Sequence, residues 1–85
     1  MSSEFTVSET LDVKGLGCPM PVVKTKQAAD DLAAGEILEV VATDVGSMSD
    51  IRGWAESTEG VELLDQVEGN GDDEKTYTHY VRATE

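Results

Sequence analysis

Residues 15–23 read Gly-Leu-Gly-Cys-Pro-Met-Pro-Val-Val, and they join an alternating apolar segment to a segment with helical spacing. A proline favours extended backbone in the residue before it and suits the first turn of a helix. The stretch therefore predicts a strand that ends before it and a helix that begins within it. Cys18 falls at the junction, where we expect it to be the helix N-cap. Pro19 and Pro21 have no N–H, so backbone amides should contribute little to a thiolate there.

The residues around Cys18 supply positive charge. Residues 13–29 contain no Asp or Glu, although the chain holds 18 acidic residues in 85. The same segment contains Lys14, Lys24 and Lys26, half of the 6 basic residues. Lysines and the positive end of a helix dipole both favour a thiolate over a thiol, so this basic island predicts a reactive cysteine. The alternative is a small buried cysteine that only packs.

Length and cysteine content limit the architecture. A chain of 85 residues suits one small domain, which we expect to span 1–85 with an ordered part of about 9–84. The single cysteine excludes an intramolecular disulfide and a Cys-x-x-Cys pair, so any sulfur or redox chemistry must be completed on another molecule. No apolar stretch is long enough to span a bilayer, and no secretion signal is recognisable at the start, so we expect a cytoplasmic protein without a membrane partner.

The charge is strongly acidic. The formal net charge is −12 at pH 7, and the acidic residues are spread along the sequence. Binding to nucleic acid requires lysines and arginines that replace counterions, so direct DNA or RNA binding is not expected. Salt would screen the self-repulsion of such a surface, which indicates a salt-loving host.

Hydrophobic spacing predicts the order β-α-β-α-β-β. The expected strands are residues 9–13, 36–43, 61–67 and 75–83, and the expected helices are 19–34 and 48–57. Ser47 and Asp50 resemble a capping box, and Asn70-Gly71 is a hairpin signal. The expected fold class is α/β, in the form of an α+β two-layer sandwich. It has a four-stranded mixed sheet, both helices on one face, and the first two strands parallel.

Parallel strands end at the same edge of a sheet, so the Cys18 loop should neighbour the loop of residues 44–47. Asp44 is a candidate for orienting a group near the sulfur, with a local turn role as the alternative. His79, the only histidine, lies on a late strand and is interpreted as a surface or packing residue. One cysteine and one distant histidine do not make a metal ligand set, and no cofactor is expected.

Three motifs resemble the TusA/SirA-like sulfur carriers. They are Leu-Asp-x-x-Gly-Leu-x-Cys-Pro-x-Pro at 11–21, Thr-Asp-x-Gly-Ser at 43–47 and Asp-Ile-x-x-Trp at 50–54. The resemblance runs from Leu11 to about Arg82, and it is consistent with a halophilic archaeal source. It implies the fold of the carboxy-terminal domain of translation initiation factor three and a persulfide-carrying cysteine at Cys18.

The candidate site also includes a set of supporting residues, namely Gly15, Pro19, Pro21, Lys24, Lys26 and Asp44. The lysines are interpreted as partner-docking or thiolate-stabilising charges, with solvated helix lysines as the alternative. The chain has Asp44-Val45 where the family often has Asp-Pro, which puts the rigidity of that loop in question.

In this interpretation a cysteine desulfurase or a rhodanese-type donor places sulfane sulfur on Cys18. The persulfide then passes it to a sulfur-accepting protein, for tRNA thiolation, molybdenum-cofactor synthesis or sulfur metabolism. The sequence offers no general base beside the cysteine, which favours a sulfurtransferase-type persulfide carrier over a stand-alone enzyme. We expect the carrier to be a monomer.

Two other functions stay open. A regulatory binding module of the same fold would use the exposed sheet face, where we expect a small apolar patch, and it would not need the thiol. The residues of that patch are Ile37, Val41, Leu64 and Tyr80. A redox sensor would oxidise Cys18 to a sulfenic acid and would need a resolving thiol from another molecule.

Overall fold

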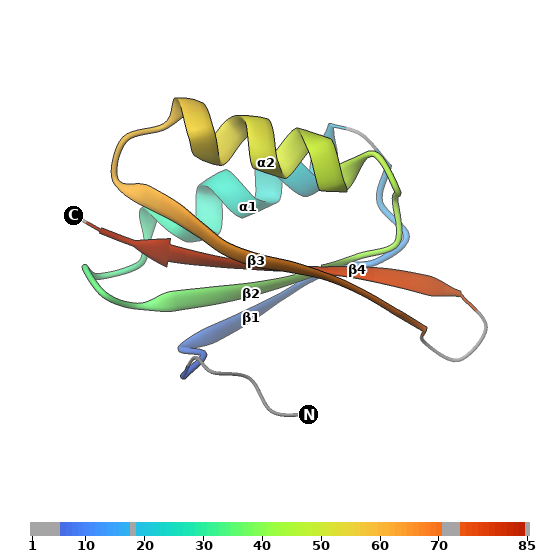
Figure 1. Cartoon of the computed structure of the whole chain (residues 1–85), viewed down its shortest axis with the longest axis horizontal. Helices are drawn as coiled ribbons and strands as arrows, with labels where there is room; N and C mark the ends of the chain where they lie inside the picture. Colours follow the sequence, from blue (N-terminus) through green and yellow to red (C-terminus); the bar gives the residue numbers. More distant parts are fainter. Residues whose placement is uncertain (1–5, 18, 71–73, 85) are drawn as a thin grey trace.

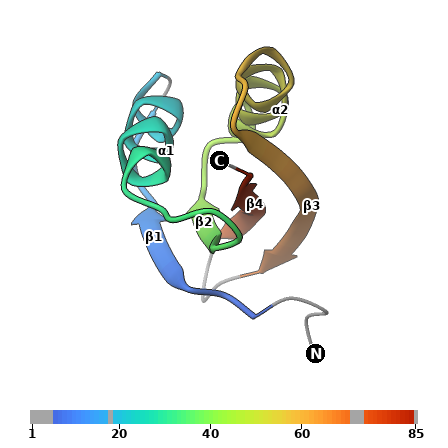
Figure 2. The same cartoon turned by 90° about the vertical axis from the view of Figure 1, so that its left-hand side faces the viewer.

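The computed structural model describes residues 6–17, 19–70 and 74–84. The elements are β1 (Glu9–Val13), α1 (Met20–Asp30), β2 (Ile37–Ala42), α2 (Ser47–Ser57), β3 (Val61–Asn70) and β4 (Lys75–Ala83). They build one sheet in the order β1-β2-β4-β3, with both helices on the same face (Figure 1, Figure 2). The predicted two-layer α+β fold with a mixed sheet is confirmed.

The sheet topology brings two strand ends together. β1 pairs in parallel with β2, and Val13 lies opposite Ala42 at their carboxyl ends. β4 is antiparallel to both β2 and β3. Because α1 follows β1 and α2 follows β2, both helices begin at the same end of the molecule (Figure 1). We call this the junction end, since the segment around position 18 connects β1 to α1 there.

The core lies between the helices and the sheet. Its centre is formed by apolar residues of β1, β2 and α2, namely Val13, Leu38, Val40, Ala42 and Ile51. The period-two spacing of β2 predicts three of these on one face, and all three are buried. Fully burying one aliphatic side chain of this kind contributes about 1.5–3 kcal/mol, so this cluster holds the two layers together.

The first helix is shorter than the predicted range 19–34. After Asp30 the chain forms a 3₁₀-type turn, because the N–H groups of Asp31 and Leu32 donate to carbonyls three residues earlier. The Glu36 carboxylate then accepts from the Ala33 N–H, at 2.8 Å. The Glu36 N–H returns to the Ala33 carbonyl, at 3.0 Å. A closed turn therefore replaces the last helical turn that apolar spacing alone predicted.

The second helix starts differently from its prediction. The N-cap residue is Gly46, and no side chain caps the helix. Ser47 lies inside the first turn and is buried, with its hydroxyl turned toward the sheet. The expected Ser47–Asp50 capping box is therefore wrong, and Asp50 instead places an acidic side chain in the first turn, where it complements the helix dipole.

The last two strands form the predicted hairpin, but β3 continues to Asn70, which lies opposite Lys75. Gly71 of the Asn-Gly signal lies outside the described residues. The register of β3 shifts between Leu63 and Asp65, which places Gln66 opposite His79. This bulge decides which β3 side chain reaches the buried histidine.

The four residues expected to form an exposed apolar patch on the open sheet face differ in their exposure. Ile37 is buried, and Val41, Leu64 and Tyr80 are only partly exposed. The Tyr80 hydroxyl donates to a Glu39 carboxylate oxygen at 2.9 Å, so its polar end is engaged within the sheet. Leu64 lines a hollow beside Met48 of α2. The regulatory-module alternative therefore has less exposed apolar area on this face than expected.

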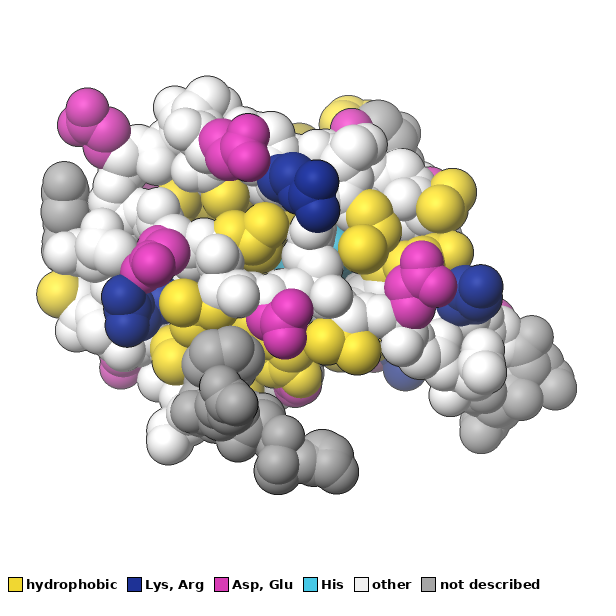
Figure 3. All heavy atoms as spheres, in the orientation of Figure 1, with side chains coloured by type: hydrophobic (Ala, Val, Ile, Leu, Met, Phe, Trp, Pro, Cys, Tyr) yellow, Lys and Arg dark blue, Asp and Glu magenta, His cyan; other side chains and the backbone are white. Residues whose placement is uncertain are grey.

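Acidic side chains are spread across the molecule. In the space-filling view they appear as separate groups on the face shown, with few basic side chains between them (Figure 3). Among the described residues, neither helix has the length and apolar character needed to cross a bilayer.

Candidate functional site

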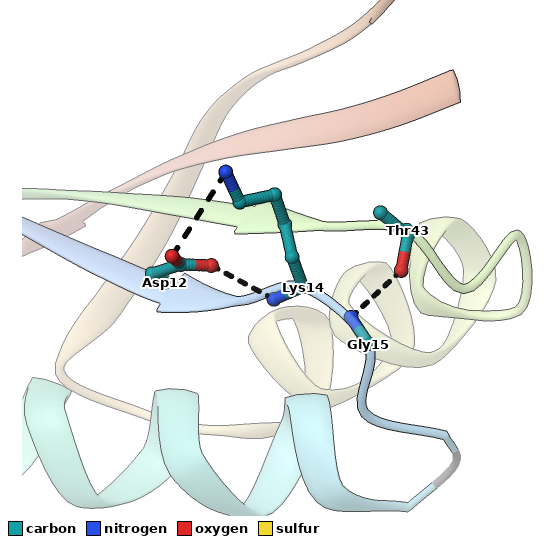
Figure 4. Close-up of polar contacts among 4 residues, drawn as sticks. All are labelled: Asp12, Lys14, Gly15 and Thr43. Carbon is teal, nitrogen blue, oxygen red and sulfur yellow. Dashed lines mark hydrogen bonds and ion pairs between the residues drawn. The ribbon is translucent and has the colours of Figure 1, made fainter. Parts of the chain in front are cut away.

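The turn that precedes Cys18 is held by two side chains from strand ends. An Asp12 carboxylate oxygen accepts from the Lys14 N–H at 2.9 Å, and the other oxygen lies 3.9 Å from Lys14 Nζ (Figure 4). The Gly15 N–H donates to Thr43 Oγ1 at 2.9 Å (Figure 4). Because Thr43 follows β2, this bond joins the two neighbouring loops at the junction end. The predicted proximity of these loops is confirmed.

Gly15 has a conformational role in this turn. Its φ is +83°, in the left-handed region that glycine tolerates far better than other residues. A Cβ at Gly15 would meet nothing within 4 Å, and the same holds for Gly17, which does not share the positive φ. Backbone geometry rather than space therefore requires glycine at position 15.

The segment after Cys18 corrects one expectation. The N-cap of α1 is Pro19, not Cys18, and Cys18 itself lies outside the described residues. The Met20 N–H donates to the Gly17 carbonyl at 2.9 Å, so this backbone amide has a partner within the chain. The first turn of α1 holds no acidic residue.

Pro21 anchors the start of α1. It is buried as the second helical residue, and its carbonyl accepts from the buried Thr25 hydroxyl at 2.7 Å. The helix thus begins against the core while Pro19 before it is exposed. This arrangement explains why one proline of the pair is structural and the other stands at the surface beside position 18.

The loop between β2 and α2 is organised by Asp44. Its Oδ1 accepts from the Gly46 N–H at 3.1 Å, and its carbonyl accepts from the Ser47 N–H at 2.9 Å. The Met48 N–H donates to the Val45 carbonyl at 3.2 Å. The local turn role weighed for Asp44 is therefore present, and these bonds order a loop that lacks the family's Asp-Pro.

Exposed apolar side chains gather at the junction end. Of the four large hydrophobic residues exposed in the described part of the chain, three belong to it: Met20 and Val23 at 37% exposure and Val45 at 67%. We call these three residues the apolar rim. The fourth, Val67, lies on β3. Apolar groups left exposed beside a candidate site are typical of surfaces that contact partners.

The three lysines of the basic island lie in different surroundings. Lys14 is near Asp12, and Lys24 is exposed on α1. Lys26 borders a groove of about 520 Å³ between the helices, together with Trp54 and Ser57 near the end of α2. Residues two apart on a helix are separated by roughly 200°, so Lys24 and Lys26 point to different sides. The three lysines do not form one cluster.

Sequence analysis missed a buried polar network centred on His79. The ring is fully buried, at 0% exposure, with Nε2 at 3.0 Å from Ser47 Oγ and Nδ1 at 3.1 Å from Gln66 Nε2. Burial lowers the pKa of His79 to about 4, so the ring is neutral near pH 7. The missed signal was the period of two on β4, which puts His79 on the same face as the buried Tyr77 and Val81.

The tautomer of His79 follows from its neighbours. Gln66 Nε2 also donates to the Met48 carbonyl at 2.8 Å, and Gln66 Oε1 accepts from Arg52 at 3.3 Å. A carbonyl only accepts and a guanidinium only donates, so the Gln66 amide has one possible orientation. His79 Nδ1 must accept from it, which leaves the proton on Nε2 to be donated to Ser47.

The fold and the strand-to-helix junction define a small α+β protein with its one cysteine between β1 and α1. A family model described as Sulfurtransferase TusA matches residues 9–83. The chain belongs to this TusA family. The crystal structure of a SirA-like protein from Desulfitobacterium hafniense is similar in fold, with a TM-score of 0.67 and 26% identity, covering 91% of this chain and 99% of that one.

Several relatives carry the name sulfur carrier protein. A putative sulfur carrier protein of Halobacterium salinarum is 68% identical over 99% of both chains. The sulfur carrier protein TusA of Pseudomonas putida is 39% identical over 94% of both chains. The TusA of Allochromatium vinosum is 38% identical over 74% of this chain and 82% of its own.

Proposed function

We propose that this chain is a sulfur carrier that holds sulfane sulfur as a persulfide on Cys18 and relays it to partner proteins. The observation that carries the proposal is the 68% identity to a putative sulfur carrier protein over nearly the full length of both chains. The junction geometry supports it, because the turn before Cys18 is pinned while the residues on either side are exposed.

The proposed transfer is an exchange between sulfur atoms. The Cys18 thiolate attacks the outer sulfur of a donor persulfide and forms a new S–S bond, while the donor's S–S bond breaks and its thiolate leaves. The acceptor's thiolate later attacks the outer sulfur on Cys18 in the same way, and Cys18 is released as a thiolate. No external oxidant or reductant is consumed, and no cofactor is needed.

Partner contact is assigned to the junction end. The apolar rim of Met20, Val23 and Val45 offers exposed apolar area around position 18. Lys24, exposed on the same helix, suits an acidic surface on a donor or acceptor. Lys26 borders the groove between the helices, so it would contact a docked partner at the edge of the interface.

The cellular setting is also a proposal. A cysteine desulfurase or a rhodanese-type protein is the donor class, and tRNA thiolation, molybdenum-cofactor synthesis or sulfur metabolism is the destination. The net charge of −12 and the similarity to a Halobacterium salinarum protein support a halophilic cytoplasm. Direct nucleic-acid binding is not part of the proposal, because so acidic a chain repels phosphates, and we propose a monomer.

Intact mass spectrometry tests the persulfide directly. The protein is incubated with a cysteine desulfurase and cysteine, alongside Cys18→Ser and a sample treated with reductant. A gain of one sulfur atom that appears only on the chain with Cys18, and disappears on reduction, supports the proposal. No gain with the desulfurase, with thiosulfate or with polysulfide would overturn it.

A further inference from the structure

We propose that the buried hydrogen bond between His79 and Ser47 positions the loop beside the Cys18 junction, which makes His79 a positioning residue for sulfur transfer. This inference rests on the proposed carrier function. It concerns a histidine that the transfer chemistry itself does not use. The network joins three elements, because His79 lies on β4, Ser47 begins α2 and Gln66 lies on β3.

The tautomer of His79 is determined by Gln66, independently of Ser47. Gln66 is fixed between the Met48 carbonyl and Arg52, so its N–H always faces His79 Nδ1. The proton of the neutral ring is then held on Nε2, aimed at Ser47 Oγ at 3.0 Å. Each side chain in this network can act only as the donor or only as the acceptor in its bond to the next. The hydrogen bonds therefore hold the start of α2 in one orientation relative to the sheet.

From Ser47 the hydrogen bonds continue to the junction. The Ser47 N–H donates to the Asp44 carbonyl, and the Asp44 carboxylate accepts from the Gly46 N–H. Thr43, next in the chain before Asp44, accepts from the Gly15 N–H. A path of short contacts therefore runs from the buried ring to a residue three positions before Cys18.

The loop on this path also carries part of the partner surface. Val45, between Asp44 and Gly46, is the most exposed member of the apolar rim, at 67%. Turning the start of α2 would move this side chain and the Thr43 hydroxyl together. The network should therefore affect recognition of protein partners, while leaving the reactivity of the sulfur itself unchanged.

Ser47→Ala removes the acceptor of the His79 bond, and Ser57→Ala is its matched control because it makes the same change at an exposed serine at the other end of α2. The first readout is hydrogen exchange of the Gly15 and Gly46 amides by NMR, with the amides of β4 as internal reference. In Ser47→Ala we expect protection to fall more at the two glycine amides than in β4, which reports only the loss of global stability from the broken buried bond. Ser57→Ala should behave like the wild type. An equal loss of protection in β4 and at the glycines, or no loss at the glycines, would overturn the inference.

The second readout is transfer from a protein persulfide donor. In Ser47→Ala we expect KM to rise roughly 2- to 30-fold, the range for residues that act through a network, with kcat retained. Alkylation of Cys18 by iodoacetamide should keep its wild-type rate. An unchanged KM, or a loss of alkylation in parallel with transfer, would contradict the inference. His79→Gln, whose amide can replace the Nε2 donor, should retain transfer, and a drop equal to that of Ser47→Ala would also count against it.

The two proposals fail differently. A wild-type chain that takes up no sulfur overturns the carrier function. The exchange of the Gly15 and Gly46 amides still decides whether Ser47 and His79 set the loop, because it requires no sulfur donor.

Discussion

Gly15 and Thr43 are joined across the ends of two parallel strands by a hydrogen bond of 2.9 Å from the Gly15 N–H to Thr43 Oγ1. The residues are 28 positions apart in sequence, yet β1 and β2 bring them together because Val13 lies opposite Ala42. This bond is the direct link between the turn before Cys18 and the loop that leads into α2. A contact that depends on the sheet thus shapes the turn that leads to position 18.

Thr43→Val should weaken this link. The substitution keeps the shape of the side chain but removes the acceptor, so the Gly15 N–H loses its partner. For an exposed hydrogen bond we expect a loss of about 0.5–1.5 kcal/mol in the free energy of unfolding, measured with urea. Thr43→Ser retains the hydroxyl and should stay near the wild type. Equal stability of Thr43→Val and Thr43→Ser would show that the bond contributes nothing.

Gly15→Ala should destabilise the chain, whereas Gly17→Ala should not. Ala at a φ of +83° costs about 1–2 kcal/mol, because its Cβ crowds the following carbonyl. Gly17 lacks the positive φ and has open space around it, so its change should stay within about 0.5 kcal/mol. Urea unfolding of the two variants measures the difference. If Gly17→Ala proved the more harmful, the conformational explanation for Gly15 would be wrong.

Sequence reasoning predicted the fold because its signals were local. The alternation of Leu38, Val40 and Ala42 required only a period of two, and the loop neighbourhood followed from parallel pairing. The TusA resemblance was likewise carried by short motifs. Each of these features is specified by a few adjacent residues, so it can be recognised without knowledge of the tertiary contacts.

The features that were missed depend on tertiary contacts. Ser47 has the sequence environment of an N-cap, but a buried His79 offers its hydroxyl a better partner inside the fold. Gln66 reaches that histidine only because a bulge shifts the register of β3. Neither the bulge nor the partner is encoded within a short window, so local spacing assigned Ser47 to the wrong role and left Gln66 unnoticed.

The buried histidine predicts an acid-sensitive stability. The pKa of His79 falls from 6.5 in the unfolded chain to about 4 in the fold because of burial, so the unfolded chain binds the extra proton between these values. Stability should therefore be complete above about pH 6.5 and fall as the pH drops toward 4, by at most about 3 kcal/mol from this group. Urea unfolding of the wild type and of His79→Gln from pH 7 to pH 4 measures it. Identical pH slopes would contradict this assignment.

The acidic surface predicts stabilisation by salt. A net charge of −12 repels itself in dilute buffer, and counterions screen that repulsion. We expect the Tm to rise by about 5 °C or more between dilute buffer and molar NaCl, which for a domain of this size is about 1 kcal/mol. KCl at the same ionic strength should act alike, which separates screening from binding of one ion. A Tm that is independent of salt would remove the inference of a halophilic host.

The apolar rim predicts a change in partner recognition without a change in stability. Val45→Ser alters the most exposed apolar side chain at the junction end, and Val67→Ser is its control on β3, where the valine is 44% exposed. Both sites face solvent, so both variants should unfold within about 0.5 kcal/mol of the wild type. Sulfur transfer from a protein donor should fall about 5-fold in Val45→Ser, close to the 1 kcal/mol of a modest interface residue, and stay unchanged in Val67→Ser. Equal transfer by the two variants would place the docking surface somewhere other than the junction end.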